Sequence, residues 1–291
     1  MFTIMGATGR VGGQIAARLL RAGEPVRAVG RSKEKLAGLA AAGAEVKVGD
    51  AGNASFLADA FRGSEGIFTM MPYDLAAPDF HAQQRSYGEA IAQAVRDSGV
   101  HHVVALSSVG AELAAGNGPI ACLHDQERRL GAIDGVHLLF LRAAYFFENF
   151  ADAMPMIREQ GVVADAYAPD VLLPMVATAD IAGVATQALR LRDWKGTVVR
   201  EVLGPRELSY AEATRIIGER IGRPELPYVQ MEYAAWADVL AAAGMSPSVA
   251  GVLADLARAI NEGRVRAAAA GDHASSMTSR FEDYAERLVS A

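Results

Sequence analysis

Three glycines spaced three residues apart stand near the start of the chain, in the run Gly6-Ala-Thr-Gly9-Arg-Val-Gly12. The run follows an apolar segment at residues 2–5 and precedes residues with helical spacing. Glycines between a strand and a helix allow a tight turn and let the backbone approach a pyrophosphate, which the helix N-terminus then binds. We therefore predict a dinucleotide-binding turn formed by Gly6, Ala7, Thr8, Gly9, Arg10, Val11 and Gly12.

The residues after the next two apolar segments bear on the choice of cofactor. A site for NAD usually offers Asp or Glu at the end of the second strand, where it holds the ribose 2′-hydroxyl. Arg31 stands there in this chain and Lys35 follows, whereas Lys33 is expected to be solvated. A guanidinium suits a 2′-phosphate, so we predict NADP(H) in preference to NAD(H). Asp50 and Ala51 are candidates for the adenine end, where Asp50 either accepts from the adenine amino group or caps a helix.

The elements that must position these residues follow a regular alternation. Short, continuous apolar runs lie at residues 2–5, 26–29, 44–48, 66–70, 102–106 and 136–141. Continuous runs are typical of strands that are covered on both faces. Between them, helical patterns include residues 11–19, a stretch beginning at Ser55, and residues 86–98. This alternation predicts an α/β fold with a doubly wound parallel sheet of the Rossmann type.

Beyond residue 150 the order of elements changes. The pattern predicts a helix at 151–160, a strand at 172–177, a helix at 178–191 capped by Thr178, a strand at 197–203, a helix opened by a capping box at Ser209, and helical structure over 232–270. We expect residues 1–150 to form an NAD(P)-binding Rossmann domain that is completed by about 178–203. Residues 151–177 and 204–291 are then expected to form a smaller, mostly helical substrate-binding lobe.

Together these segments resemble the NmrA-like branch of the atypical short-chain dehydrogenases. The resemblance rests on the glycine turn with Arg31, on Gly49-Asp50, on Leu106-Ser107-Ser108 and, most specifically, on the run from Arg142 through Tyr145 to Asn149. Segments at 179–182, 208–212 and 221–224 agree, so it extends over essentially the whole chain. The resemblance implies an NADPH-dependent reductase of quinones or of azo or triphenylmethane dyes, a redox-sensing regulator without activity, or a tailoring enzyme of aromatic polyketides.

The catalytic pattern departs from that of ordinary short-chain dehydrogenases, which use Tyr-x-x-x-Lys to protonate a carbonyl oxygen. None of the eight tyrosines has Lys four residues later. In the corresponding region many relatives have His-x-x-x-Glu or a Lys, but here His124 stands three residues before Glu127 and Leu123 occupies the fourth position. Carbonyl reduction by the usual route is therefore not expected. Quinone or dye reduction stays open, because hydride transfer to a good acceptor needs less acid catalysis.

Other candidates lie where strands end. Ser107 is expected either to hydrogen-bond the substrate or the cofactor carboxamide, or to be a strand-end hydroxyl bonded within the protein. Met70, Met71 and Pro72 are expected beside the cofactor ribose. Tyr145 is a candidate for the wall of the nicotinamide pocket, with core packing as the equal alternative. His124, Tyr145 and Ser107 are the catalytic candidates, and no metal site is predicted, because no His or Cys cluster with ligand spacing is present.

Composition excludes several classes of protein. Hydrophobic residues make up 51% and charged residues 21% of the 291, which is ordinary for a globular protein. A net charge of −6 and only four lysines argue against direct binding of nucleic acid. The single cysteine, Cys122, suits a reducing compartment. Without an apparent leader or a span of about 20 apolar residues, we expect a cytoplasmic protein that does not enter the membrane.

Three functions remain in competition. The first is an NADPH-dependent oxidoreductase that reduces a quinone or another flat aromatic acceptor, with Tyr233, Trp236 and Met245 of the second lobe covering the substrate. The second is a reductase or hydroxylase (monooxygenase) that tailors aromatic polyketides. The third is a non-catalytic NADP-binding redox sensor, which the missing Tyr–Lys pair favours. A homodimer is compatible with each of them.

Overall fold

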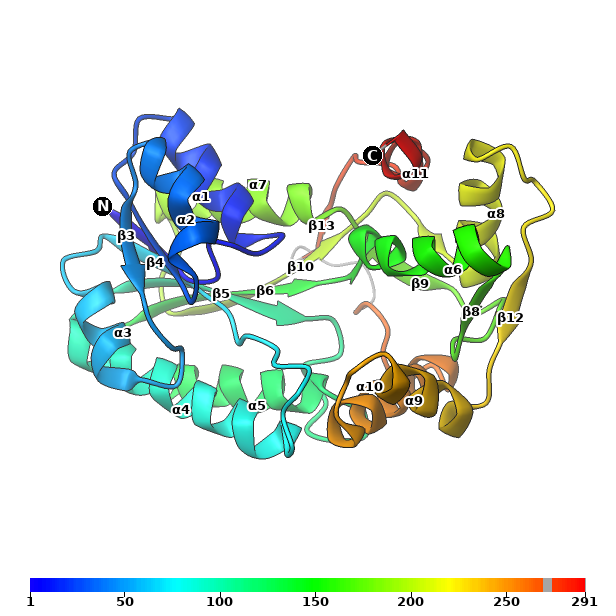
Figure 1. Ribbon diagram of the computed structural model, residues 1–291. Helices are drawn as coiled ribbons and strands as arrows, with labels where there is room; N and C mark the ends of the chain where they lie inside the picture. The colour runs from blue at the N-terminus through cyan, green and yellow to red at the C-terminus, as the bar shows by residue number, and fades with distance from the viewer. Residues whose placement is uncertain (269–273, 291) are drawn as a thin grey trace.

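The computed structural model describes residues 1–268 and 274–290. Within these residues, eight parallel strands form the main sheet, in the order β13-β10-β6-β5-β4-β1-β2-β3 (Figure 1). The strands are β1 Phe2–Ile4, β2 Val26–Gly30, β3 Glu45–Val48, β4 Gly66–Thr69, β5 His102–Ser108, β6 His137–Ala143, β10 Thr197–Leu203 and β13 Ala274–Ser276. The predicted α/β fold with a parallel sheet is therefore confirmed.

Helices cover both faces of this sheet (Figure 1). One face carries α1 (Gly12–Arg21), α2 (Lys33–Ala41) and α7 (Thr178–Leu191), and the other carries α3 (Ala54–Phe61), α4 (Phe80–Ser98) and α5 (Ile120–Gly131). Because both faces are covered, side chains on both faces of central strands such as β1 and β4 are buried. This explains why the strands read as continuous apolar runs.

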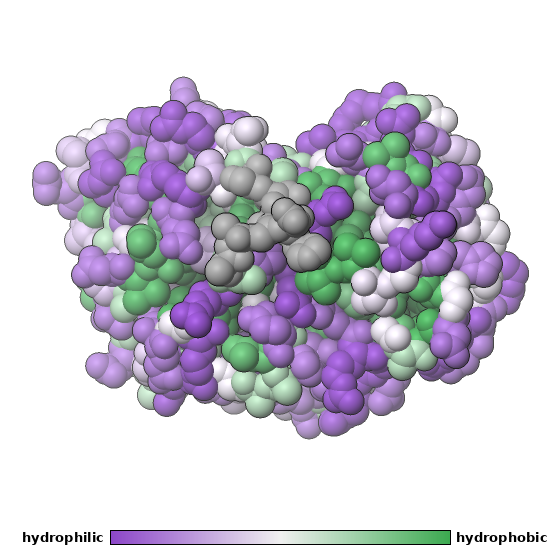
Figure 2. All heavy atoms as spheres, turned by 180° about the vertical axis from the view of Figure 1, so that it is seen from behind, coloured by the Kyte–Doolittle hydropathy of each residue, from purple (hydrophilic) through white to green (hydrophobic). Residues whose placement is uncertain are grey.

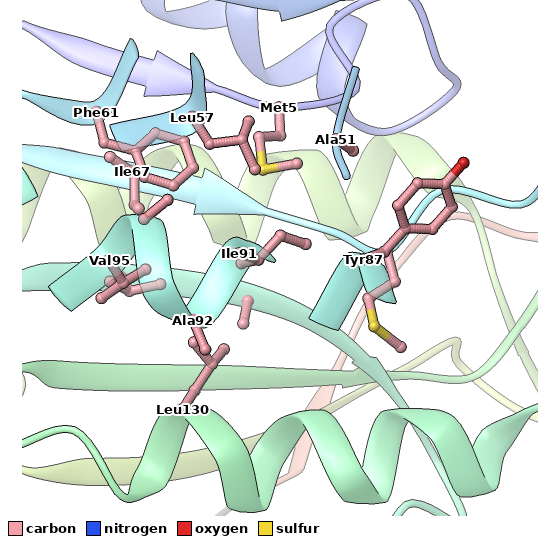
Figure 3. Close-up of a cluster of buried hydrophobic side chains, with 14 of the residues drawn as sticks. Met5, Ala51, Leu57, Phe61, Ile67, Tyr87, Ile91, Ala92, Val95 and Leu130 are labelled. Carbon is pink, nitrogen blue, oxygen red and sulfur yellow. The ribbon is translucent and has the colours of Figure 1, made fainter. Parts of the chain in front are cut away.

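The cluster beneath α3 and α4 shows how the chain fills this core (Figure 3). Leu57 and Phe61 of α3 and Ile91 and Val95 of α4 pack around Ile67 of β4, and each is at most 1% exposed. The spacing of four residues places each helical pair on one face of its helix. Burial of one such side chain contributes about 1.5–3 kcal/mol, so helix and sheet hold each other in place.

A second group of elements follows β6. Its strands are β7 Tyr145–Phe146, β8 Val163–Asp165, β9 Leu173–Val176, β11 Glu207–Leu208 and β12 Tyr228–Gln230, which form the small sheets β11-β9-β7 and β12-β8. Its helices are the 3-10 helix η1 Phe147–Ala153, α6 Met154–Gln160, α8 Tyr210–Arg220, α9 Tyr233–Ala242, α10 Pro247–Asn261 and α11 Phe281–Ser290. These elements share a third apolar cluster that includes Phe147, Tyr167 and Phe281. The intervening α7 and β10 instead pack on the main sheet.

Two helices differ from the prediction in the first half of the chain. Lys33 and Lys35 lie in a helix, α2, that the apolar pattern did not predict. Ser32 is the N-cap of this helix. Only Leu36 of α2 is buried, so the helix has little of the apolar periodicity that reveals a helix in a sequence. Helix α4 begins at Phe80 rather than at residue 86, because the Asp79 side chain accepts a hydrogen bond from the Ala82 N–H at 2.9 Å.

Further differences lie beyond residue 150. Ala177, not Thr178, is the N-cap of α7, and no side chain caps it by the usual hydrogen bond. The predicted capping of α8 by Ser209 is confirmed, at 3.2 Å from the Glu212 N–H. The helical stretch predicted at 232–270 is two helices, since α9 ends before Gly244, which has a φ of 99°. After α10 ends at Asn261 the chain is not helical up to residue 268, and residues 269–270 lie outside the described residues.

The surface is mostly hydrophilic on the face that Figure 2 shows, with hydrophobic side chains in smaller groups between. Large apolar side chains that are exposed, such as Leu172 and Leu191, belong to different elements. Scattered exposed apolar residues are normal on a folded protein. Over residues 1–268 and 274–290, no helix combines the length and the apolar character needed to cross a bilayer.

The contact between β1 and α1 generates a stability prediction. A Cβ atom at Gly12 would lie 2.4 Å from the Gly6 carbonyl oxygen and 2.7 Å from that of Met5. Gly12→Ala should therefore lower the free energy of unfolding by about 1–3 kcal/mol, measured in urea. Gly38→Ala is the matched control, because nothing lies within 4 Å of its Cβ position in helix α2. It should raise stability by about 0.4–1 kcal/mol. Equal effects of the two substitutions would contradict this account of the turn.

Candidate cofactor and substrate site

The glycine turn lies where the strand order of the sheet changes direction. β1 has β2 on one side and β4 on the other, and ligands of such sheets bind at the carboxyl ends of the strands beside this point. Gly6 has a φ of 62°, which favours glycine, and its carbonyl accepts the Gly9 N–H at 2.8 Å. Helix α1 then begins at Gly12 without a side-chain cap at Val11. The Gly13 N–H donates to the Gly9 carbonyl at 3.0 Å, whereas the Gly12 N–H has no hydrogen-bond partner among the described residues and can face an anion.

The turn has a buried and an exposed part. Ala7, Val11 and Gly12 are buried, whereas Thr8, Gly9 and Arg10 are exposed. The Ala7 N–H is bonded to the Val29 carbonyl at 3.1 Å, which fixes the turn on β2. The Arg10 guanidinium reaches the side chains of Asn149 and Asp152, each at 3.3 Å. The structure therefore places Arg10 beside η1 as well as beside the turn.

The residues predicted for the adenosine end lie at the ends of β2 and β3. Arg31 is exposed immediately after β2, and Lys35 lies in the first turn of α2. Asp50 Oδ1 accepts the Gly52 N–H at 2.7 Å and so closes its own turn. The alternative that Asp50 caps the next helix is wrong, because Asn53 is the N-cap of α3. Ala51 is buried beside Tyr87 (Figure 3).

The segment after β4 joins this region to the glycine turn. The Met70 sulfur lies 3.0 Å from the position that a Cβ atom would take at Gly6. Met71 is buried, and the Pro72 carbonyl accepts a hydrogen bond from the Gln84 side chain at 2.8 Å. Tyr73 follows and is 41% exposed, although the sequence reading did not single it out. Met70 is therefore the residue of this segment that contacts the turn.

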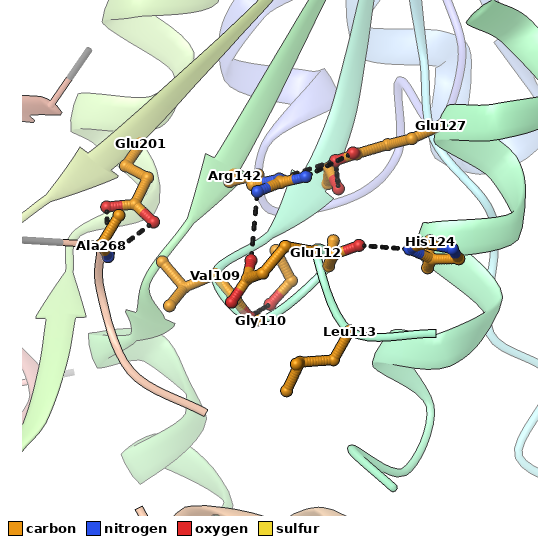
Figure 4. Close-up of polar contacts among 12 residues, drawn as sticks. Val109, Gly110, Glu112, Leu113, His124, Glu127, Arg142, Glu201 and Ala268 are labelled. Atoms are coloured by element: carbon orange, nitrogen blue, oxygen red, sulfur yellow. Dashed lines mark hydrogen bonds and ion pairs between the residues drawn. The ribbon is translucent and has the colours of Figure 1, made fainter. Parts of the chain in front are cut away.

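A polar network occupies the ends of β5 and β6 (Figure 4). The Ser107 hydroxyl donates to Glu127 Oε1 at 2.6 Å. Arg142 donates to both Glu127 oxygens, at 3.0 and 2.7 Å, and to Glu112 at 3.1 Å. The hydrogen bonds to Glu127 raise the pKa of Arg142 above its usual value. Ser107 is thus a strand-end hydroxyl that is hydrogen-bonded within the protein, to Glu127. Its oxygen can still accept a hydrogen bond.

His124 lies on α5 one turn before Glu127, but it is directed elsewhere. Its Nδ1 lies 2.9 Å from the Ala111 carbonyl oxygen, so this nitrogen carries a proton and Nε2 is the acceptor of the neutral ring (Figure 4). In the described part of the chain, no hydrogen bond joins His124 to Ser107 or Tyr145. The structure therefore does not bring the three catalytic candidates into one bonded group.

Tyr145 lies in a cluster of phenol side chains. Its hydroxyl is hydrogen-bonded to that of Tyr210, and its ring meets Tyr167 and Phe150 edge to face at 5.7 and 6.2 Å. Tyr167 and Tyr210 stack with their centroids 4.5 Å apart. Burial, together with the charge of Asp165, raises the pKa of Tyr145, so it remains a neutral hydrogen-bond donor.

The run 142–149 connects these parts. The Glu148 carboxylate accepts from the Thr178 N–H at 3.0 Å and from its hydroxyl at 2.6 Å. Gln14 of α1 in turn donates to the Thr178 hydroxyl at 2.9 Å. With the contact between Asn149 and Arg10, the segment after β6 is bonded to α1, α7 and the glycine turn.

The residues expected to cover the substrate have other partners. Trp236 is buried and its ring lies 6.3 Å from that of Tyr167. The Tyr233 hydroxyl accepts from the Asn261 side chain at 2.9 Å, and Arg258 lies over its ring. Met245 packs against the apolar cluster that includes Phe80. Three or more side chains of His, Cys, Asp or Glu that could hold a metal do not gather anywhere in the described ranges.

Comparison with known proteins gives the chain its family. The model of the NmrA-like family matches residues 1–285. A curated relative from Streptomyces griseus subsp. griseus is 32% identical over 224 residues, which cover 77% of this chain and 75% of the relative. It is named (4-alkanoyl-5-oxo-2,5-dihydrofuran-3-yl)methyl phosphate reductase.

Two solved structures share the fold. The NADPH-dependent quinone oxidoreductase of Escherichia coli, complexed with NADPH, has a TM-score of 0.80 at 22% identity and covers 99% of this chain and all (100%) of its own. The triphenylmethane reductase of Citrobacter sp., complexed with NADP(H), has a TM-score of 0.79 at 20% identity and covers 100% and 99%. With the family model matched over nearly its whole length, this chain belongs to the NmrA-like family.

Proposed function

We propose that this protein is an NADPH-dependent oxidoreductase that reduces a quinone or another flat, conjugated acceptor by direct hydride transfer. The observation that carries the proposal is the glycine turn, which stands at the carboxyl edge of the sheet in front of a helix without a side-chain cap. The relative and the two structural neighbours described above are two reductases and one oxidoreductase, and the two solved complexes contain NADPH or NADP(H).

The residues of the turn fit a dinucleotide. A pyrophosphate needs close backbone approach, which the missing side chain at the exposed Gly9 allows, and it needs a free N–H group, which Gly12 offers at the start of α1. The exposed residues Thr8, Gly9 and Arg10 would contact the phosphates. Met70 to Pro72 would border the ribose of the nicotinamide half. When bound there, NADPH supplies the hydride.

Arg31 favours NADP(H) over NAD(H). Its guanidinium is exposed at the end of β2, and no carboxylate lies within ion-pair distance of it in the part of the chain that the structure describes. A ribose 2′-phosphate would therefore meet an available cation there, with Lys35 nearby on α2. An acidic residue that would prefer the 2′-hydroxyl does not occupy this position.

The polar groups near the nicotinamide end suit an acceptor that needs little acid catalysis. The Glu127 carboxylate forms an ion pair with Arg142 and accepts hydrogen bonds from Arg142 and Ser107, so its oxygens already have partners within the protein. Ser107 can accept a hydrogen bond from the substrate, and Tyr145 can donate one to it. A quinone becomes a phenolate-like anion of modest basicity on receiving a hydride, so one neutral donor suffices. This favours a quinone over an isolated ketone.

The second group of elements would hold the acceptor. We assign this substrate lobe to residues 151–177 and 204–291, with the Rossmann domain formed by 1–150 and completed by about 178–203. Two strands are exceptions to these bounds: β13 pairs with β10 in the main sheet, and β7 pairs with β9 in a small sheet. The pairing of β10 with β6 and the contacts of α7 with α1 support the assignment of 178–203. Tyr145, which follows β6, would lie where domain and lobe meet.

Turnover is the direct test. Wild-type protein mixed with NADPH should consume it when quinones, azo and triphenylmethane dyes, or an alkanoyl-oxo-dihydrofuran are supplied. Gly9→Asp should abolish cofactor binding by calorimetry, because its side chain would fill the phosphate position and add a negative charge. Gly9→Ala lacks the charge and should retain weakened binding. A wild type that binds NADPH but consumes none with any acceptor would favour the redox sensor instead.

Arg31→Ala tests the choice of cofactor. A charge-assisted contact to phosphate is worth roughly 1.5–3 kcal/mol, or about 10–150-fold in affinity. The variant should lose NADPH affinity on that scale in a fluorescence titration, while its NADH affinity stays nearly unchanged. Equal losses for both cofactors would show that Arg31 does not discriminate between them.

His124→Ala and Tyr145→Phe test the catalytic candidates. Each should lower quinone turnover by less than roughly 10²-fold, because loss of a required general acid costs about 10²–10⁴-fold. Rates are compared at saturating NADPH, with cofactor binding measured separately. A loss of several thousand-fold in either variant, with binding intact, would identify an essential acid that this proposal lacks.

A further inference from the structure

The exposed part of the glycine turn is linked to α7 and to the segment after β6 by a row of hydrogen bonds. The side-chain amide of Gln14, in the first turn of α1, donates to the Arg10 carbonyl at 2.7 Å and to the Thr178 hydroxyl at 2.9 Å. The Thr178 hydroxyl in turn donates to Glu148 at 2.6 Å. We call these four groups the Thr178 network. Through it, the backbone of an exposed turn residue depends on side chains that are far away in sequence.

The direction of each hydrogen bond in the Thr178 network follows from the chemistry of its groups. A backbone carbonyl and a carboxylate can only accept, so the Gln14 amide nitrogen faces Arg10 and the Thr178 proton points to Glu148. The Thr178 oxygen then has lone pairs free for the second N–H of Gln14. Both N–H groups of the Gln14 amide are therefore used, and the network has one arrangement.

Burial and the start of a helix hold Thr178 in this network. Thr178 is 1% exposed, and a buried hydroxyl that loses its partners is costly. Glu148 also accepts the Thr178 N–H at 3.0 Å. Ala177, the N-cap of α7, provides no side-chain cap, so the Glu148 carboxylate takes this role from outside the helix, where a negative charge is favourable. Glu148 thus fixes Thr178 by both its backbone and its hydroxyl.

A second hydrogen bond between α1 and α7 provides a comparison. The two helices pack against each other on one face of the sheet (Figure 1). The Arg18 guanidinium donates to the Ala179 carbonyl at 3.1 Å, one turn further along α1 than Gln14. Both side chains join α1 to the start of α7, but Gln14 also bonds to the glycine turn. Loss of the Arg18 bond should therefore affect the packing of the helices and leave the Arg10 carbonyl in place.

We propose that Thr178 is a positioning residue for the dinucleotide: its hydroxyl orients Gln14, which fixes the Arg10 carbonyl and so holds the exposed turn ready for the pyrophosphate. The inference rests on the proposed cofactor-dependent function. A turn that already has its bound conformation loses less conformational freedom on binding, and this raises affinity. Because Thr178 is buried, it acts through Gln14 and not by contact with the cofactor.

The effect should concern affinity and be equal for both dinucleotides. The pyrophosphate is common to NADPH and NADH, whereas the 2′-phosphate expected at Arg31 is not. A loosened turn should therefore raise the dissociation constants of both cofactors by the same factor. The value of kcat at saturating NADPH and the KM for the acceptor should not change, because the Thr178 network contains none of the groups proposed to contact the acceptor.

Thr178→Val tests the network, because valine has nearly the shape of threonine but no hydroxyl. In fluorescence titrations the variant should bind NADPH and NADH each about 3–10-fold more weakly, which is the scale of one net hydrogen bond. Thr178→Ser keeps the hydroxyl and should stay within about twofold of the wild type. Arg18→Met is the matched control. It should lower the free energy of unfolding in urea and leave both affinities unchanged.

Gln14→Met makes the same test at a partly exposed position, should Thr178→Val fail to fold. The double variant should lose no more affinity than the weaker of the two single variants, since both changes break one network. Full affinity of either single variant, additive losses, a Thr178→Ser variant as weak as Thr178→Val, or a loss for NADPH but not for NADH would overturn the inference. The expected affinities in a protein that reduces no acceptor would support the network and contradict the proposed reductase function.

Discussion

The fold and the proposed cofactor site both depend on one constraint, the absence of a side chain where α1 meets the end of β1. The backbone of Gly12 lies so close to the carbonyl oxygens of Gly6 and Met5 that no Cβ atom fits. This contact starts α1 directly at the carboxyl edge of the sheet, with no side chain capping its first turn. The same packing requirement thus sets the start of α1 at the point where the strand order reverses.

The residues at the end of β6 and just after it connect the glycine turn to other elements by hydrogen bonds. Arg142 bonds to α5 through Glu127, Glu148 bonds to the start of α7 through Thr178, and Asn149 reaches Arg10 of the glycine turn. These contacts give several polar side chains of the run from Arg142 to Asn149 a structural role. Each joins a different element to the same short stretch of chain, so one connection holds α5, α7 and the glycine turn together.

The sequence predicted the parts of the molecule that local patterns determine. The apolar runs predicted every strand of the main sheet except β13, and the spacing of Gly6, Gly9 and Gly12 predicted the turn. The sequence did not predict helix α2, because only Leu36 of this helix is buried and its apolar residues form no stripe along one face. The partners of Tyr145 could not be predicted, since Tyr210 comes 65 residues later and only tertiary packing joins them.

Anaerobic single-turnover reaction with NADPH deuterated at the transferred position of the nicotinamide tests the central claim most directly. Direct hydride transfer predicts that one equivalent of NADPH is consumed for each acceptor reduced, that deuteration slows this step, and that deuterium appears in a product in which a carbon atom accepts the hydride. NADPH that stays bound and unoxidised in the presence of every acceptor, or oxidation that deuteration does not slow under single-turnover conditions, would contradict it.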